Sequence, residues 1–239
     1  MTLSMPALFV ADAPGLDFLN SVATPVDTPL DWLADGEGLL NWLGQAALVP
    51  HEVLERFRNE AMPGELDRVA AQARDLREWF RGFVRAHKGR PLIAEALAEL
   101  APLNRLLERD ELHEVVGPAT EAAHGLSLQT VRRWKSPESL LLPIGGTLAR
   151  LLTGEDFASV KACEGPNCTL LFADHTRARN RRWCSMELCG NSGRASTGEA
   201  GSVGDGDAAV SGVASFQPVQ QGDGVIGNGN VAVAARVHQ

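Results

Sequence analysis

All four cysteines of the chain lie in one short stretch, as two pairs with the same internal spacing. Four residues separate Cys163 from Cys168, four separate Cys184 from Cys189, and fifteen lie between the pairs. Two cysteine pairs, each closed by a turn and joined by a loop, supply the four thiolates of a tetrahedral zinc site. We therefore expect these side chains to bind one structural Zn²⁺ per chain.

Two other interpretations of the cysteines remain open, namely two disulfides or four unrelated buried thiols. Disulfides need an oxidising compartment, and residues 1–15 lack the basic start and the long apolar run of a secretory signal. A catalytic zinc needs an open coordination position, which four thiolates do not leave. His175, in the loop between the pairs, could replace a cysteine as a ligand or act as a base.

The same loop carries the densest basic cluster of the chain, which consists of Arg177, Arg179, Arg181 and Arg182. These side chains could contact the phosphates of a nucleic acid. They could equally balance the metal site, because four thiolates and one Zn²⁺ sum to a charge of −2. The whole chain has a net charge of −8, which opposes binding to a polyanion. We therefore expect binding to duplex DNA to be weak.

Residues around the cysteines resemble those of the CGNR zinc finger. The matching positions are Cys163, Cys168, Phe172, Asp174, Arg177, the run Arg181-Arg182-Trp183-Cys184-Ser185-Met186, and Cys189-Gly190-Asn191. Residues 15–20, GLDFLN, resemble the opening motif of the ABATE domain, the usual N-terminal partner of this finger, whose proposed role is stress-induced regulation of transcription. The resemblance covers residues 14–191 and breaks at Ser192, where the family has an Arg followed by a basic helix.

Several residues flanking the cysteines are expected to surround the metal site. Phe172 and Trp183 should pack over it, against the helix that ends at Thr153. Asp174 and Asn191, which belong to the resembling motif, are expected beside them as packing or second-layer partners.

The rest of the sequence predicts a mostly α N-terminal domain with a minor antiparallel β element, an α+β fold. Apolar residues recur at helical spacing in residues 36–46, 50–58, 65–87, 92–109 and 136–153. Pro143 and two glycines predict a kink or break in the last of these. Residues 14–22 form a short helix or strand. Alternating patterns predict strands over 111–116 and 126–134.

Composition divides the chain into four parts. They are an N-terminal extension (1–13), the ABATE-like domain (14–155), the zinc finger (158–191) and a Gly-, Ala-, Ser- and Val-rich tail (192–239) that we expect to be disordered. A change of reading frame in the gene could also explain the tail. Because the finger is too small for a core of its own, loss of one cysteine is expected to unfold residues 160–191 only.

The leading hypothesis for function is a cytoplasmic, bacterial-type transcription regulator with a structural zinc. The alternative is a zinc-stabilised module that binds a protein partner, or a second copy of itself, without binding DNA. An enzyme is less favoured, because no catalytic motif accompanies its candidate groups, Asp17, Asn20, His113 and Glu114. No apolar run reaches the ~20 residues of a membrane span.

Overall fold

The computed structural model describes residues 6–24, 29–119 and 125–190, and these all fall within one compact unit. Its α-helices are α1 (Pro14–Leu19), α2 (Gly36–Gln45), α3 (His51–Glu60), α4 (Glu65–His87), α5 (Ala101–Leu107) and α6 (Leu141–Gly154). Shorter helical turns are η1 (Ala94–Leu100), η2 (Pro137–Leu140), η3 (Phe157–Ser159) and η4 (Met186–Gly190). Asn191 and the tail lie outside the described residues.

Within the described residues, six strands form three separate antiparallel pairs. They are β1 (Val22–Ala23) with β2 (Leu30–Asp31), β3 (Leu112–Pro118) with β4 (Leu126–Arg132), and β5 (Val160–Ala162) with β6 (Leu171–Ala173). The predicted α+β class, with mostly helices and a minor antiparallel element, is therefore confirmed. The predicted hairpin corresponds to β3 and β4.

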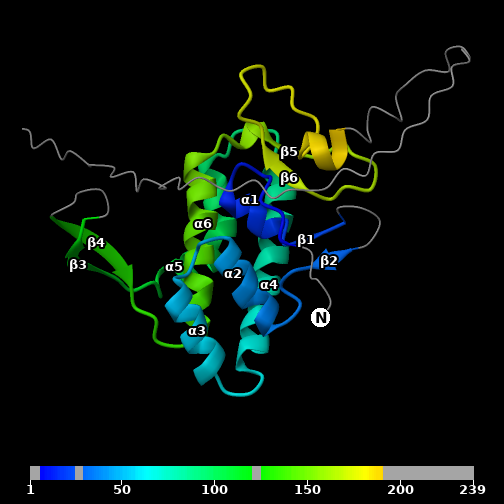
Figure 1. The fold of residues 1–239 in the computed structure, drawn as a ribbon. Coiled ribbons are helices and arrows are strands. Elements are labelled where there is room, and N and C mark those ends of the chain that lie inside the picture. The colour runs from blue at the N-terminus through cyan, green and yellow to red at the C-terminus, as the bar shows by residue number, and fades with distance from the viewer. Residues whose placement is uncertain (1–5, 25–28, 120–124, 191–239) are drawn as a thin grey trace, which may run out of the picture. The chain divides into compact units, whose positions relative to one another are not determined.

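The short helix α1 is the centre of the packing, where it contacts α4, α6 and β6 (Figure 1). Five of its six residues are buried, including Leu16, Phe18 and Leu19. Gly15 allows the close approach to α6, because a Cβ atom there would lie 2.9 Å from Leu151 Cβ and 3.0 Å from the Thr147 carbonyl oxygen. The GLDFLN motif therefore joins the helical part of the chain to the strand that follows the first cysteine pair.

Helices α2, α3 and α4 follow the predicted boundaries closely. Asp35 caps α2, since its side chain accepts a hydrogen bond from the Gly38 N–H at 2.8 Å. α2 packs on both α3 and α4, and its Trp42 ring lies edge-on to Phe18 of α1, with ring centroids 5.7 Å apart. This aromatic pair joins α2 to α1.

Two predicted helices are divided differently in the structure. The segment 92–109 consists of η1 followed by α5, because Pro102 in the first turn of α5 has no N–H to continue an earlier helix. The segment 136–153 consists of η2 followed by α6, and the break comes before Pro143. Pro143 then lies in the first turn of α6, where no backbone N–H is required, so α6 runs on to Gly154.

The arginines of α4 mostly serve the fold. Arg77 is buried and forms a bidentate ion pair with Asp31, with both N···O distances at 2.8 Å. Arg81 is buried too and donates to the Leu19 carbonyl at the end of α1. Arg74 donates to the carbonyls of Leu33 and Ala34. These three side chains therefore stabilise the packing of α4 and do not form a solvated face of the helix.

Asp17 predicts a measurable pH dependence of stability. Burial in α1 raises the pKa of its carboxyl from 3.8 to about 6, although the Ala11 N–H donates to it at 3.0 Å. A carboxyl whose pKa is raised on folding lowers the stability of the protein as the pH rises from the ordinary pKa, 3.8, through the raised one, about 6. Between pH 5 and pH 8 the wild type should lose about 1 kcal/mol relative to Asp17→Asn. Urea unfolding of both proteins at the two pH values checks this. If the difference in unfolding free energy between wild type and Asp17→Asn were the same at pH 5 and pH 8, the Asp17 carboxylate would not be buried as a charge.

Candidate metal centre

The first cysteine pair lies in the loop that joins β5 to β6. Cys163 follows β5 directly, and its N–H donates to the Leu170 carbonyl at 2.9 Å, which closes the loop. Inside the loop the Cys168 N–H donates to the Gly165 carbonyl at 3.1 Å, and Asn167 takes a left-handed conformation with φ of 63°. A Cβ atom on Gly165 would lie 2.9 Å from the Cys189 sulfur. Glycine is therefore needed for the second pair to approach.

The second pair lies on and just before the short helix η4. Cys184 precedes η4, and Cys189 lies within it, with its N–H donating to the Ser185 carbonyl at 3.1 Å. The Ser185 hydroxyl accepts hydrogen bonds from the N–H groups of Glu187 and Leu188 and so caps this turn. The Cys184 N–H points back to the Cys163 sulfur at 3.3 Å. These bonds bring the two pairs together.

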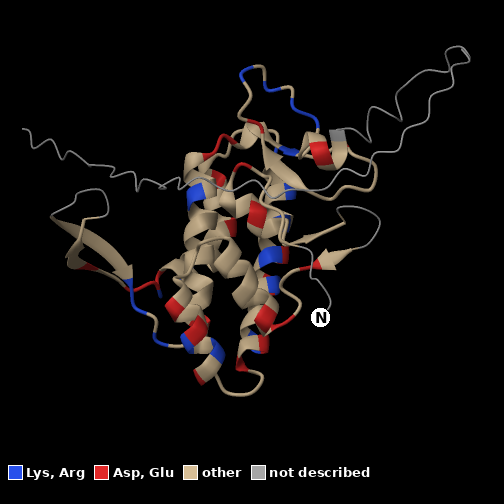
Figure 2. Cartoon of the chain, viewed as in Figure 1, with Lys and Arg blue, Asp and Glu red and all other residues tan. Residues whose placement is uncertain are grey.

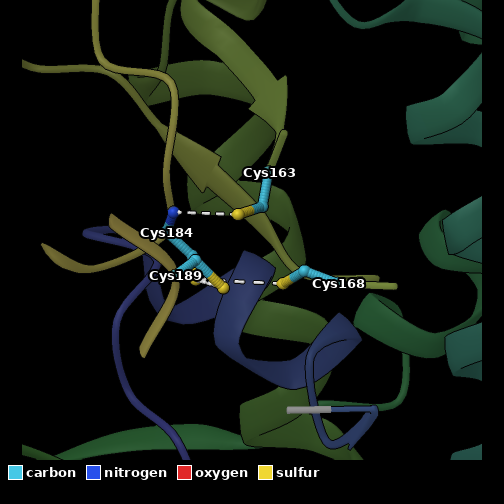
Figure 3. Close-up of side chains that lie close together, drawn as sticks. All are labelled: Cys163, Cys168, Cys184 and Cys189. Atoms are coloured by element: carbon cyan, nitrogen blue, oxygen red, sulfur yellow. Dashed lines mark hydrogen bonds between the residues drawn. The ribbon is translucent and has the colours of Figure 1, made fainter. Parts of the chain in front are cut away.

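The four sulfur atoms form one compact cluster (Figure 3). The Cys184 sulfur lies 3.9 Å from that of Cys168 and 3.6 Å from that of Cys189, and all four lie within 4.8 Å of one another. In a tetrahedral site with Zn–S bonds of about 2.3 Å, neighbouring sulfurs are about 3.8 Å apart. None of the cysteines forms a disulfide, and a disulfide would need sulfurs about 2.05 Å apart. The cluster therefore fits a four-thiolate zinc ion.

The protonation of the cluster also favours a bound cation. The hydrogen bond from Cys184 lowers the pKa of the Cys168 thiol to about 5, whereas the same bond raises the pKa of Cys184. Burial raises the pKa of Cys189 to about 12. Four thiols this close cannot all lose their protons unless a positive charge lies between them. A divalent metal ion supplies that charge and lets all four bind as thiolates.

Asp174 organises the loop between the two pairs. It is buried at the end of β6 and accepts hydrogen bonds from the Thr176 N–H at 3.0 Å and the Arg181 N–H at 2.9 Å. The Lys161 ammonium pairs at 2.7 Å with Oδ2, the oxygen that also accepts from the Arg181 N–H. These donors hold the pKa of the Asp174 carboxyl well below its usual range, against the effect of burial. Asp174 thus fixes both ends of the arginine loop.

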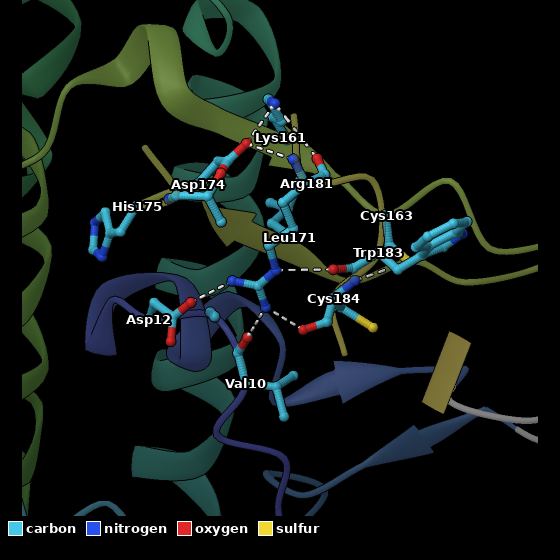
Figure 4. A network of polar contacts seen from close by, with 12 residues as sticks. Val10, Asp12, Lys161, Cys163, Leu171, Asp174, His175, Arg181, Trp183 and Cys184 are labelled. Atoms are coloured by element: carbon cyan, nitrogen blue, oxygen red, sulfur yellow. Dashed lines mark hydrogen bonds and ion pairs between the residues drawn. The ribbon is translucent and has the colours of Figure 1, made fainter. Parts of the chain in front are cut away.

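The four loop arginines are not equivalent, and Arg181 faces the protein. Its guanidinium donates to the carbonyls of Val10 and Trp183, at 3.0 and 2.9 Å, and to that of Cys184 (Figure 4). It also pairs with Asp12 and lies 4.4 Å from the centre of the Phe172 ring. The side chain is only 20% exposed. Arg181 therefore connects the second cysteine pair to the N-terminal segment.

The other three arginines lie on the exposed side of the loop. Figure 2 shows the basic residues along the long loop after β6. Arg179 pairs with Asp156, and Arg182 pairs with Glu164 and lies over the Trp183 ring at 5.2 Å. Arg177 is exposed and makes no hydrogen bond or ion pair with any residue that the structure describes.

The remaining predicted site residues take different places. Phe172 is fully buried on β6, which packs against α1, and Trp183 is half-buried under Arg182. His175 is exposed, and its Nε2 atom lies 2.7 Å from Glu155 rather than in the sulfur cluster. Asn191, the last residue of the expected motif, lies outside the described residues.

The candidate groups for an enzyme are not gathered into one site. Asp17 lies in α1 and accepts a backbone hydrogen bond, whereas His113 and Glu114 are exposed on β3. The Asn20 amide donates to the Leu171 carbonyl at 2.8 Å and accepts from the Leu171 N–H at 2.9 Å. Asn20 thereby pairs the end of α1 with β6 as a further strand would. Sequence reasoning noted Asn20 in the GLDFLN motif but had no way to find this partner.

Comparison with known families adds two matches. Residues 12–155 match the ABATE family, whose description is "Putative stress-induced transcription regulator". Residues 159–199 match the CGNR zinc finger, a match that extends past Asn191, where the resemblance was expected to end. None of the curated proteins compared matches the chain. The finger match and the sulfur cluster together identify one structural zinc site. Among the described residues, no helix is long and apolar enough to cross a membrane.

Proposed function

Because the chain belongs to the ABATE family and carries a CGNR zinc finger, we propose that it is a transcription regulator whose zinc ion organises a nucleic-acid-binding loop. The observation that carries the proposal is the loop between the cysteine pairs. Both of its ends are fixed at the sulfur cluster and at Asp174, while three arginines remain on its exposed side. The helical part of the chain would then regulate this loop through α1.

The zinc ion in this proposal is bound by Cys163, Cys168, Cys184 and Cys189. Four thiolates fill a tetrahedral coordination shell and leave no position for water, so the metal would hold the fold rather than take part in a reaction. The N–H groups of Gly165 and Cys184 donate to the Cys163 sulfur at 3.4 and 3.3 Å. Such donors offset part of the negative charge that four thiolates leave on the site.

The phosphate contacts would come from Arg177, Arg179 and Arg182. Two of them form ion pairs with exposed carboxylates, and pairs of that kind contribute little, so a phosphate could replace the carboxylate. Three contacts give a slope of about −2.7 for log K against log salt concentration. With a net charge of −8 on the chain, we expect weak binding without strong sequence preference.

A salt titration of duplex DNA binding by fluorescence anisotropy tests this proposal. The double variant Arg177→Glu/Arg182→Glu should abolish the weak binding of the wild type. Its control is Arg85→Glu/Arg150→Glu, which makes the same change in net charge at two exposed arginines of α4 and α6. Equal losses in both variants would mean that only net charge matters. Loss in the control alone would place recognition on the helices.

A second candidate function is a zinc-stabilised module that binds a protein and no DNA. It is favoured by the ion pairs of the loop arginines, which leave few free cations for phosphates. Of the four arginines, only Arg177 has no hydrogen bond or ion pair among the described residues. Absence of measurable DNA binding by the wild type at low salt would support this candidate and refute the first.

A further inference from the structure

The hairpin of β3 and β4 exposes an apolar face. Alternation along the strands and the pairing of Val116 with Leu128 and of Pro118 with Leu126 place these residues on one face, together with Leu112. The exposed fractions are 54% for Leu112, 68% for Val116, 79% for Leu126 and 64% for Leu128. In Figure 1 the hairpin extends away from the helices. An exposed apolar patch with this spacing is typical of an interaction surface.

The opposite face of the hairpin is better covered, although it is more polar. Val115, Ser127, Gln129 and Val131 on that face are half-buried, and the Gln129 side chain donates to the Pro118 carbonyl at 2.7 Å. A two-stranded hairpin in water normally turns its polar face outward, and two strands alone are only marginally stable. Packing of another layer of protein on the exposed apolar face of β3 and β4 would therefore stabilise the hairpin.

The free edge of β4 also suits a protein partner. At the two ends of the hairpin, the Arg133 N–H donates to the Glu111 carbonyl and the Ala119 N–H donates to the Gly125 carbonyl. Odd-numbered residues therefore make the ladder bonds, so the backbone groups of Leu126, Leu128 and Thr130 point to the open edge. β4 contains no Lys, Pro, Asp or Glu, the residues that usually protect an edge from pairing.

We propose that this face is where a second copy of the chain docks, so that the protein forms a two-fold dimer. The face carries one acidic residue, Glu114 on β3, and one basic residue, Arg132 on β4. A two-fold axis along the strands places β3 of one copy over β4 of the other. That arrangement places Val116 over Leu128 and Pro118 over Leu126 of the other copy. Glu114 then lies over Thr130 and Arg132 over Leu112, so no like charges meet and the face can pack on a copy of itself. A nucleic acid would need several cations here, and the face offers only Arg132, which already pairs with Asp110 at 2.6 Å.

Sedimentation velocity and light scattering of the full chain test the dimer. The wild type should have twice the 25.5 kDa mass of one chain at concentrations above about 10 μM, the range expected for a small interface. Leu126→Lys/Leu128→Lys should be monomeric. The control Met62→Lys/Ile93→Lys changes two exposed apolar residues elsewhere, 69% and 64% exposed, and should remain dimeric. Unchanged zinc content would show that each variant is folded.

Hydrogen exchange of the unmodified chain gives a second test that does not depend on a variant. Amides in 112–118 and 126–132 should exchange more slowly at high protein concentration than at low concentration, while those of α2 should not change. A wild type that stays monomeric would overturn the proposal, as would a dimer that persists in the hairpin variant or exchange in the hairpin that does not depend on concentration.

Discussion

Replacing Cys184 with serine is expected to abolish stoichiometric zinc binding and to destabilise both residues 160–190 and the N-terminal segment that packs on them. Cys184 is fully buried, its sulfur is within 3.9 Å of two others, and its N–H donates to a third. Structural zinc contributes about 10–16 kcal/mol to the folding of small finger peptides. A loss of even part of this is comparable with the whole stability of a domain, about 5–15 kcal/mol.

The destabilisation is expected to extend beyond the zinc finger, which composition alone does not suggest. Sequence reasoning expects residues 160–191 to unfold by themselves, but β6 is bound to the N-terminal segment at several points. The Ala173 N–H donates to the Ala11 carbonyl at 2.8 Å, and Asn20 pairs with Leu171 through two hydrogen bonds. When the finger unfolds, these groups lose their partners, and a buried group without a partner costs about 1–3 kcal/mol.

Zinc content and hydrogen exchange of Cys184→Ser measure this effect. Peptides covering 6–24 and 160–190 should both exchange faster than in the wild type, whereas α3 should change little. Met186→Ser is the matched control. Met186 lies two residues from Cys184 in η4 and its side chain is exposed, so this variant should keep its zinc. Full zinc in Cys184→Ser, or an unchanged N-terminal segment, would refute the expected coupling.

The second large effect is expected for Arg181→Ala. The substitution leaves the carbonyls of Val10, Trp183 and Cys184 without this donor and removes the ion pair with Asp12. Hydrogen bonds from a charged group contribute about 1.5–3 kcal/mol each, so we expect a loss of about 2–4 kcal/mol in the free energy of unfolding. Arg181→Lys should restore only part of it, because an ammonium cannot reach several acceptors in a plane as a guanidinium does.

Urea unfolding of Arg181→Ala and Arg177→Ala in parallel gives the comparison. Arg177 belongs to the same loop, is exposed and has no hydrogen-bond or ion-pair partner among the described residues, so its replacement should change stability by less than about 0.5 kcal/mol. If the two variants were equally stable, Arg181 would not be the connection between the finger and the N-terminal segment.

Local patterns predicted those parts of the molecule that local physics decides. The equal spacing of the cysteine pairs indicated the metal site, and apolar periodicity located α2, α3 and α4, because both signals are contained within a few turns of chain. The same reasoning could not separate the roles of four arginines within six residues. Arg181 differs from Arg177 because of Val10, a residue 171 positions away in the sequence. Likewise, the role of Asn20 depends on Leu171, 151 positions away.

The divided helices have a different cause. Pro102 and Pro143 each lie in the first turn of a new helix, a position that proline favours. From the sequence alone, a proline within a helical pattern can equally mark a kink, a break or a start. The packing of Gly15 against Leu151 and Thr147, which sets the position of α1 on α6, similarly depends on contacts that no local pattern contains.

Zinc K-edge X-ray absorption of the purified chain, combined with metal analysis, tests the central claim most directly. We expect one zinc per chain with four sulfur neighbours at about 2.3 Å and no oxygen or nitrogen bound to the metal. A first shell that contains nitrogen or oxygen, or well under one equivalent of zinc with two disulfides found by mass spectrometry, would contradict it.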